Sequence, residues 1–348
     1  MPHNASAAER SIREYLESYL YTVARIRDLD TLRERLSPSA SLGEGMAGTA
    51  YALWRLGEPR LARRWADAAR QDSGRRAFHT RLAPATRRTS TMFGQAGVRW
   101  VAAMVGGAPH TRAYADSLGD GCTRLEFASG TAGQLLTGLL LVRERPDQAI
   151  RRLLARNADR LDRALRRRSR TPWTPRDATG FAHGWPGVLF ALLAWHRAAG
   201  SSPSPDSIDA LSRLARLWSP YTIETPALRA SWCNGAAGAT LLWVAAFESM
   251  GDPVFLRLAR RTARAAVAAS GHASTLCCGD TGVAFALLAM ARVDPGAAWR
   301  DPASALCARA IGQAVMPHPF GLFHGHAGLA CLAHDCLAGA GGFPALER

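Results

Sequence analysis

The sequence predicts an all-α protein, an α/α toroid, and three observations support this fold class. A Gly-x-small-Gly pattern followed by an apolar run occurs seven times. The segments between these runs have apolar residues at helical spacing, and no segment shows a convincing strand alternation. Seven buried helices that alternate with amphipathic ones can bury their apolar faces by closing into a ring. We therefore expect seven inner helices around an axis and about seven outer helices that cover them.

The glycine pairs mark the repeats. Their first glycines are 36 to 54 residues apart, which is the range of helical repeat proteins. In a ring, all pairs lie at the N-termini of the inner helices, and we call this end of the ring the rim. The pairs are Gly45/Gly48, Gly94/Gly97, Gly130/Gly133, Gly184/Gly187, Gly235/Gly238, Gly279/Gly282 and Gly325/Gly328.

A short and almost entirely apolar segment follows each pair. A helix that is apolar on all sides must be buried on all sides, so these segments are predicted as the inner helices. Residues 147–166 are different, because Ile150, Leu154 and Leu161 form one stripe among arginines and aspartates. This pattern predicts an outer helix with one wet face. We expect residues 43–348 to form the toroid and residues 1–42 to be an N-terminal helical extension that packs on it.

Composition excludes several classes of protein. The chain has 348 residues, of which 48% are apolar and 20% charged, enough to close a full-sized core. Its apolar runs are far shorter than the roughly 18 to 20 residues of a membrane-spanning helix. The first residues contain no apolar signal region. We therefore expect no membrane span and a cytoplasmic protein.

The net charge of +15 comes from 43 basic residues, all of them arginine. This excess predicts acidic partners. Nucleic acid is the usual partner of so basic a chain, but the arginines are scattered and form no recognised nucleic-acid-binding motif, so we expect no nucleic acid. An acidic peptide fits the charge equally well. Seven cysteines, an odd number, favour thiol or metal chemistry over a disulfide framework.

Reactive side chains are concentrated at the rim of the last four repeats. Cys233 and the Cys277-Cys278 pair lie at matching offsets before consecutive glycine pairs, which predicts three neighbouring thiols. Helix N-termini favour thiolates, and three soft ligands with an open fourth position are typical of a catalytic zinc site. The alternative is three buried cysteines that act as small apolar residues. The residues directly before the first glycines are Glu44, Phe93, Ser129, His183, Asn234, Cys278 and His324.

Three motifs together resemble the LanC-type lanthipeptide cyclases, in a stand-alone form. They are Trp232-Cys233-x-Gly235, Leu276-Cys277-Cys278-Gly279 and Ala182-His183-Gly184-x-Pro186-Gly187, combined with the seven glycine turns. The resemblance extends over residues 42–336. It implies an α/α toroid with one zinc ion, an enzyme of the lyase class. The implied reaction is Michael-type addition of a peptide cysteine thiolate to dehydroalanine or dehydrobutyrine, which forms (methyl)lanthionine thioether rings in lantibiotic precursors.

The resemblance also implies the roles of individual residues. Cys233, Cys277 and Cys278 become zinc ligands, and Cys278 replaces the histidine of better-known members, which makes the site more electron-rich. His183 is the implied catalytic histidine, and Arg229 is implied to stabilise the enolate oxygen.

Two positions depart from the pattern of the family. Glu126 stands where the family usually has aspartate, so its role in catalysis is open. Asn234 replaces a tyrosine and removes one proton donor. His324, at the same rim offset in the last repeat, is a candidate substitute.

The implied partners are a dehydrated precursor peptide with an acidic leader and a separate dehydratase or kinase/lyase enzyme. Three alternatives stay open. The first is a catalytically degenerate LanC-like scaffold that binds the precursor peptide or a partner enzyme. The second is a toroidal carbohydrate enzyme, for which only Glu44 and Glu126 offer carboxylates at the rim. The third is an enzyme that adds the thiol of glutathione.

Overall fold

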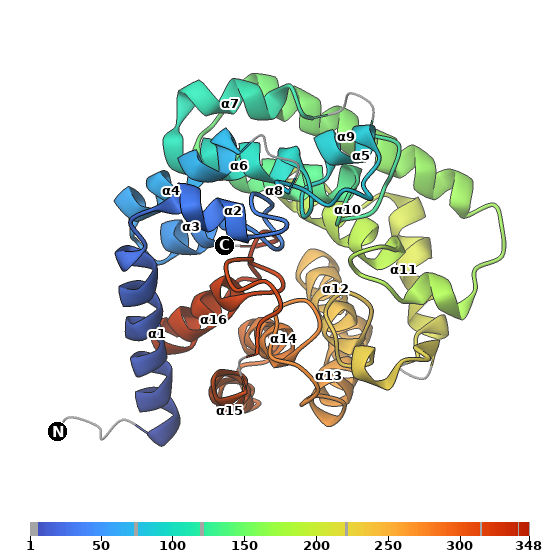
Figure 1. Cartoon of the computed structure of the whole chain (residues 1–348). Coiled ribbons are helices and arrows are strands. Elements are labelled where there is room, and N and C mark those ends of the chain that lie inside the picture. Colours follow the sequence, from blue (N-terminus) through green and yellow to red (C-terminus); the bar gives the residue numbers. More distant parts are fainter. Residues whose placement is uncertain are drawn as a thin grey trace.

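Seven helices surround a central axis, and a second set of helices lies outside them (Figure 1). The computed structural model describes residues 6–72, 76–118, 122–219, 222–313, 315–339 and 341–347. Within these ranges the chain forms sixteen α-helices and no β-strand. The predicted all-α toroid is thereby confirmed. None of the described helices is long and apolar enough to cross a membrane.

Each inner helix begins directly after the first glycine of a pair. Its apolar composition matches its position, since every residue of α12 from 236 to 246 is buried. Each inner helix packs against the next one, and the last packs against the first. The inner helices are α3 (Met46–Arg55), α6 (Gln95–Gly106), α8 (Thr131–Glu144), α10 (Trp185–Ala199), α12 (Ala236–Met250), α14 (Asp280–Val293) and α16 (His326–Ala338).

The outer helices are amphipathic and turn one face to the inner ring. In α9, Ile150, Leu154 and Leu161 are buried while most of its arginines are exposed. Six outer helices follow inner helices in the chain: α4 (Pro59–Gln71), α7 (Ala108–Ala115), α9 (Gln148–Arg168), α11 (Pro205–Leu217), α13 (Pro253–Ala268) and α15 (Arg300–Gly312). The shorter helices are α2 (Leu29–Arg35), α5 (Pro84–Thr89), η1 (Pro175–Ala178) and η3 (Pro226–Leu228).

The N-terminal helix α1 (Ala7–Arg25) completes the outer layer. It packs against α15 and α16 through a face that buries Ile12, Tyr19 and Val23. The helix therefore fills the outer position beside the last inner helix (Figure 1). The division of the chain into residues 1–42 and 43–348 stays a prediction.

Seven backbone hydrogen bonds close the ring at the rim. In each, the N–H group two residues before a first glycine donates to the carbonyl oxygen of the equivalent residue in the next repeat, over 2.8 to 3.3 Å. Because Cys233 and Cys277 belong to this circle, its hydrogen bonds fix their backbones relative to each other. The donors are, in order, Gly43, Met92, Ala128, Ala182, Cys233, Cys277 and Phe323, which donates back to Gly43.

The second glycine of each pair allows the inner helix to approach the preceding loop. A Cβ atom on Gly238 would lie 2.2 Å from the carbonyl oxygen of Trp232, and one on Gly282 would lie 2.3 Å from that of Leu276. Only glycine fits at such distances. The repeated glycine pattern is therefore a packing requirement of the rim.

Aromatic side chains fill the axis below the rim. The Trp232 ring contacts those of Phe127, Phe181 and Phe323, which come from other repeats, at centroid distances of 5.0 to 5.5 Å. Phe343 of the C-terminal segment stacks on the same indole at 5.1 Å. The centre of the ring is thus a packed core, and the rim residues stand above it.

Candidate metal centre and active site

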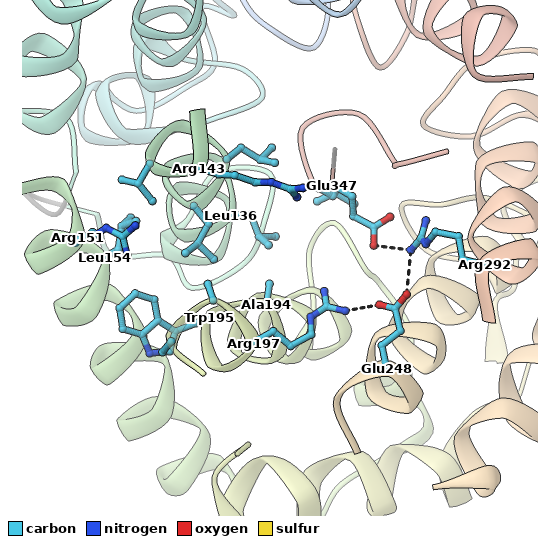
Figure 2. A pocket seen from close by; sticks show the side chains of 16 residues that line it. Leu136, Arg143, Arg151, Leu154, Ala194, Trp195, Arg197, Glu248, Arg292 and Glu347 are labelled. Atoms are coloured by element: carbon cyan, nitrogen blue, oxygen red, sulfur yellow. Dashed lines mark hydrogen bonds and ion pairs between the residues drawn. The ribbon is translucent and has the colours of Figure 1, made fainter. Parts of the chain in front are cut away.

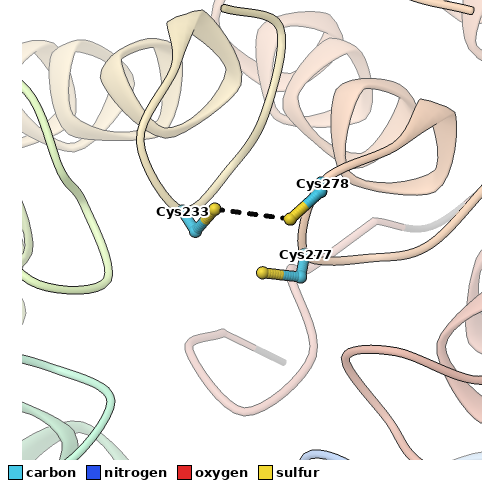
Figure 3. A group of neighbouring side chains, drawn as sticks. All are labelled: Cys233, Cys277 and Cys278. Atoms are coloured by element: carbon cyan, nitrogen blue, oxygen red, sulfur yellow. Dashed lines mark hydrogen bonds between the residues drawn. The ribbon is translucent and has the colours of Figure 1, made fainter. Parts of the chain in front are cut away.

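Three cysteines meet at the rim where α12 and α14 begin. The Sγ atoms of Cys233, Cys277 and Cys278 all lie within 4.8 Å of one another. Those of Cys233 and Cys278 are 3.6 Å apart (Figure 3). Cys233 and Cys277 are buried, and Cys278 is partly exposed. We call these three residues the thiol cluster.

Hydroxyl side chains hold the two loops of the thiol cluster. Ser231 Oγ accepts a hydrogen bond from the backbone N–H of Asn234 at 3.1 Å, and Thr275 Oγ1 accepts one from that of Cys278 at 3.2 Å. Two further groups contact the sulfur of Cys233, since its thiol lies 3.6 Å from Ser231 Oγ and the Asn234 amide donates to it at 3.7 Å.

Sequence reasoning missed Ser231 and the amide contact of Asn234. A signal for the hydroxyl was present, because the residue four positions before the first glycine is also a serine or threonine in three other repeats, at Ser41, Ser90 and Thr275. In each of these repeats the hydroxyl accepts from the N–H group three residues later. The hydroxyl is therefore part of the turn that presents the rim residue.

The three thiols do not ionise alike. Hydrogen bonds from Cys277 and Cys278 hold the pKa of Cys233 well below the ordinary thiol value. The hydrogen bond to Cys233 raises the pKa of Cys277, and it raises that of Cys278 to about 12. The protein alone thus favours a single thiolate, on Cys233. A thiophilic divalent cation is the group that can hold all three sulfurs as thiolates, so this donor set fits Zn²⁺.

His183 and Glu126 form a pair on one side of the thiol cluster. Nδ1 of His183 lies 2.9 Å from Oε2 of Glu126, and Arg124 lies 3.6 Å from the other carboxylate oxygen. The Glu126 side chain is mostly buried, whereas that of His183 is 53% exposed. The hydrogen bond that His183 donates to Glu126 raises the pKa of His183 above its ordinary value. Backbone hydrogen bonding of Ala182 to Cys233 places the pair beside the cluster.

A second pair of a carboxylate and an imidazole lies on the other side of the thiol cluster, where the seventh repeat meets the first. Nδ1 of His324 lies 3.1 Å from Oε1 of Glu44, and His318 approaches the same oxygen at 3.6 Å. His79 forms an ion pair with the other oxygen. Burial alone would raise the pKa of Glu44. The three histidines outweigh this effect and hold the pKa below its ordinary value, so the carboxyl group is an anion. We call these four residues the Glu44 cluster.

Sequence reasoning did not find this cluster. His79 and His318 lie in loops outside the repeat register, and Glu44 and His324 are 280 residues apart until the ring closes.

Arg229 lies in the loop that leads to Cys233, just after η3. It is partly buried, and its Nε donates to the carbonyl oxygen of Ile223 at 3.1 Å. The structure therefore brings together the three predicted cysteines, joins His183 to Glu126, and joins His324 to Glu44. It places Arg229 in the same loop as Cys233.

A comparison with protein families shows the family of the chain. Residues 37–345 match the family model described as "Lanthionine synthetase C-like protein". The chain belongs to this family. The predicted resemblance to LanC-type proteins is thereby confirmed.

Comparisons of this LanC-like chain with solved structures and with curated sequences found less similarity. Among solved structures, a protein described as "Nisin cyclase" has 12% sequence identity and a TM-score of 0.49, and the match covers 94% of this chain and 93% of that one. No curated protein sequence matches the chain significantly.

Proposed function

We propose that this LanC-like protein is a zinc-dependent lanthipeptide cyclase that forms (methyl)lanthionine rings in a dehydrated precursor peptide. The observation that carries the proposal is the set of three sulfur atoms within 4.8 Å at the rim. The His183–Glu126 and His324–Glu44 pairs, in the repeats on either side of the cluster, are proposed to transfer protons there. Metal binding, a nucleophile and proton donors are what thiol addition to an alkene requires.

The thiol cluster is the proposed metal site. A zinc ion held by Cys233, Cys277 and Cys278 would bind the substrate cysteine as its thiolate and, with three sulfur ligands, keep that thiolate strongly nucleophilic. The rest of the rim acts on the peptide. The hydrogen bonds that Ser231 and Asn234 make to Cys233 orient this ligand.

The addition forms one bond and consumes one π-bond. The sulfur of the substrate thiolate attacks the β-carbon of the dehydro residue, and the electron pair of the alkene moves to the carbonyl oxygen as an enolate. The guanidinium of Arg229 stabilises this oxygen. His183 then gives a proton to the α-carbon, so that no atom leaves the peptide. Because Nδ1 is bonded to Glu126, Nε2 is the nitrogen that faces the substrate.

His324 is proposed as a second proton-transferring group. It replaces the donor that Asn234 cannot supply, and Glu44 holds its Nδ1. The proposed partners are a precursor peptide with an acidic leader and a separate dehydratase or kinase/lyase, which must supply the alkenes before ring closure. The proposed setting is antibiotic biosynthesis in the cytoplasm.

Ring closure itself tests the proposal. A peptide with one dehydroalanine and one cysteine keeps its mass on cyclisation but loses its free thiol. Mass spectrometry after alkylation therefore separates the open peptide from the ring. We expect loss of the alkylated species with wild-type protein and its persistence with the His183→Gln variant.

One observation favours a second candidate, a LanC-like scaffold without turnover. Asn234 directs its amide to the sulfur of Cys233, where the family often has an acidic hydroxyl. A scaffold would bind the dehydrated peptide and leave its thiol free at all protein concentrations. Persistence of the alkylated peptide with zinc-loaded wild-type protein would favour this candidate.

A further inference from the structure

A cavity of about 680 Å³ lies at the end of the toroid opposite the rim. The C-terminal halves of the inner helices α8, α10, α12 and α14 form it, together with the first turns of the outer helix α9 and the C-terminal segment (Figure 2). Because an inner helix of 14 or 15 residues is roughly 21 Å long, the cavity is far from the thiol cluster. It has no role in the proposed chemistry.

The cavity has an apolar wall and an excess of positive charge. Leu136, Leu154 and Trp195 form the apolar part. On the other side, Arg197 and Arg292 pair with two glutamates, as the dashed lines in Figure 2 show. This network of two arginines and two glutamates, Glu248 and Glu347, is neutral.

Arg143 and Arg151 supply the excess charge. Both line the cavity, both are exposed, and neither makes an ion pair with any described residue. Two cations beside an apolar wall suit a ligand that combines carboxylates with apolar side chains. A continuous phosphate backbone would leave the apolar wall of Leu136, Leu154 and Trp195 without a partner, so the chemistry favours a peptide over a nucleic acid.

The site is longer than one cavity. A second cavity of about 360 Å³ shares Leu140 and Glu347 with the first. Its lining includes Tyr51 and Trp54 together with the Arg55–Asp335 ion pair. The two cavities together form what we call the basal groove. An extended chain can follow such a groove, with carboxylates near Arg143 and Arg151 and apolar side chains toward the aromatic rings.

We propose that the basal groove binds an acidic peptide segment with apolar side chains, and that this segment belongs to the same precursor peptide whose thiols are cyclised at the rim. The second half of this proposal rests on the proposed function. Binding at the groove would keep the peptide attached while its rings close one after another, because a tethered substrate has a high effective concentration at the rim.

The test uses a fluorescein-labelled peptide of alternating leucine and glutamate that has no cysteine and no dehydro residue. Its binding to the full chain is followed by fluorescence anisotropy. We expect the Arg143→Gln/Arg151→Gln variant to bind about tenfold or more weakly, since both charge-assisted contacts with the carboxylates of the peptide are lost. The matched control is Arg156→Gln/Arg163→Gln, which removes the same charge from exposed positions of α9 outside the groove.

The control is expected to change the dissociation constant by less than about twofold, as for distant exposed charges. A peptide of glutamate alone should bind more weakly than the alternating one, since it cannot use the apolar wall. Equal weakening in both double variants, no binding by the wild type, or a groove-dependent preference for vesicles with phosphatidylglycerol over the peptide would overturn the proposal.

The Cys277→Ala variant separates the two proposals. It should bind the labelled peptide as the wild type does, whatever its cyclase activity. A protein that binds the peptide in the groove but never closes a ring would disprove the proposed function and leave the groove as a peptide site. A protein that closes rings but does not bind the peptide would disprove the groove site and leave the proposed function standing.

Discussion

Nδ1 of His183 lies 2.9 Å from a carboxylate oxygen of Glu126, and the two side chains come from neighbouring repeats. The carboxylate favours the imidazolium form and orients the ring, and Nε2 takes no part in this contact. The pair thus has the arrangement of a positioned general acid.

Replacing Glu126 by glutamine should shift the pH dependence of ring closure. Without the carboxylate, His183 loses the interaction that raises its pKa, so the imidazolium is lost at a lower pH. We expect the alkaline limb of the rate profile to move to lower pH and the rate at pH 8 to fall about tenfold. The Glu126→Asp variant should restore most of the activity. An unchanged profile in Glu126→Gln would remove Glu126 from the mechanism.

The same pair makes stability depend on pH. The pKa of His183 is raised in the folded state. Its contribution to the free energy of unfolding is therefore complete below the pKa of the unfolded state, about 6.5, and is lost as the pH rises through the pKa of the folded state. The difference in Tm between wild type and Glu126→Gln should therefore be larger at pH 6 than at pH 9. The difference will be small because His183 is 53% exposed. A difference that grows with pH has the wrong sign for this account.

Changing Cys278 to histidine should keep the metal but slow the reaction. One thiolate ligand fewer makes the site less negative, so a bound substrate thiolate is less nucleophilic. We expect Cys278→His to retain one zinc per chain and to close rings several-fold more slowly. The check is a comparison of single-turnover rates at equal zinc content. Equal or faster ring closure would refute the proposed advantage of three sulfur ligands.

His324 should matter for turnover and not for the metal. The His324→Gln variant is expected to lower the rate of ring closure while zinc content stays the same, because its Nδ1 binds Glu44 and not the thiol cluster. His272→Gln is the control, as His272 is exposed in a loop of another repeat. A loss of zinc in His324→Gln would show that the residue has a different role.

Ser231 should stabilise the rim turn. Its hydroxyl accepts from the N–H of Asn234 and contacts the sulfur of Cys233. The Ser231→Ala variant should lose about 1 kcal/mol of stability, the usual value for such a hydrogen bond. Thermal unfolding of the metal-free protein measures it. Ser212→Ala, which removes a hydroxyl that bonds only within an outer helix, should change Tm much less.

The toroid was predictable because the same sequence pattern recurs in all seven repeats. The glycine pairs permit close backbone approach, and the apolar runs after them require burial on all sides, which a closed ring provides. The position of α1 was not predictable. Its apolar stripe of Ile12, Tyr19 and Val23 fits any apolar surface, and only the empty outer position beside α16 selects α15 and α16 as neighbours.

The candidate site was predictable where residues share a repeat offset. Cys233 and Cys277 occupy equivalent positions of consecutive repeats, so the packing of these two repeats against each other brings them together. His79 and His318 could not be found this way, since they reach Glu44 from loops outside the register. The basal groove could not be predicted either, because Arg143 lies at the end of an inner helix and Arg151 on an outer one, and nothing in the sequence pairs these two positions.

The central claim is that the three cysteines hold zinc, and elemental analysis of the purified, reduced protein tests it most directly. The wild type and a Cys122→Ala control should contain one zinc per chain, and folded Cys277→Ala should contain much less. Folded wild-type protein without zinc, or equal zinc in Cys277→Ala, would contradict the account.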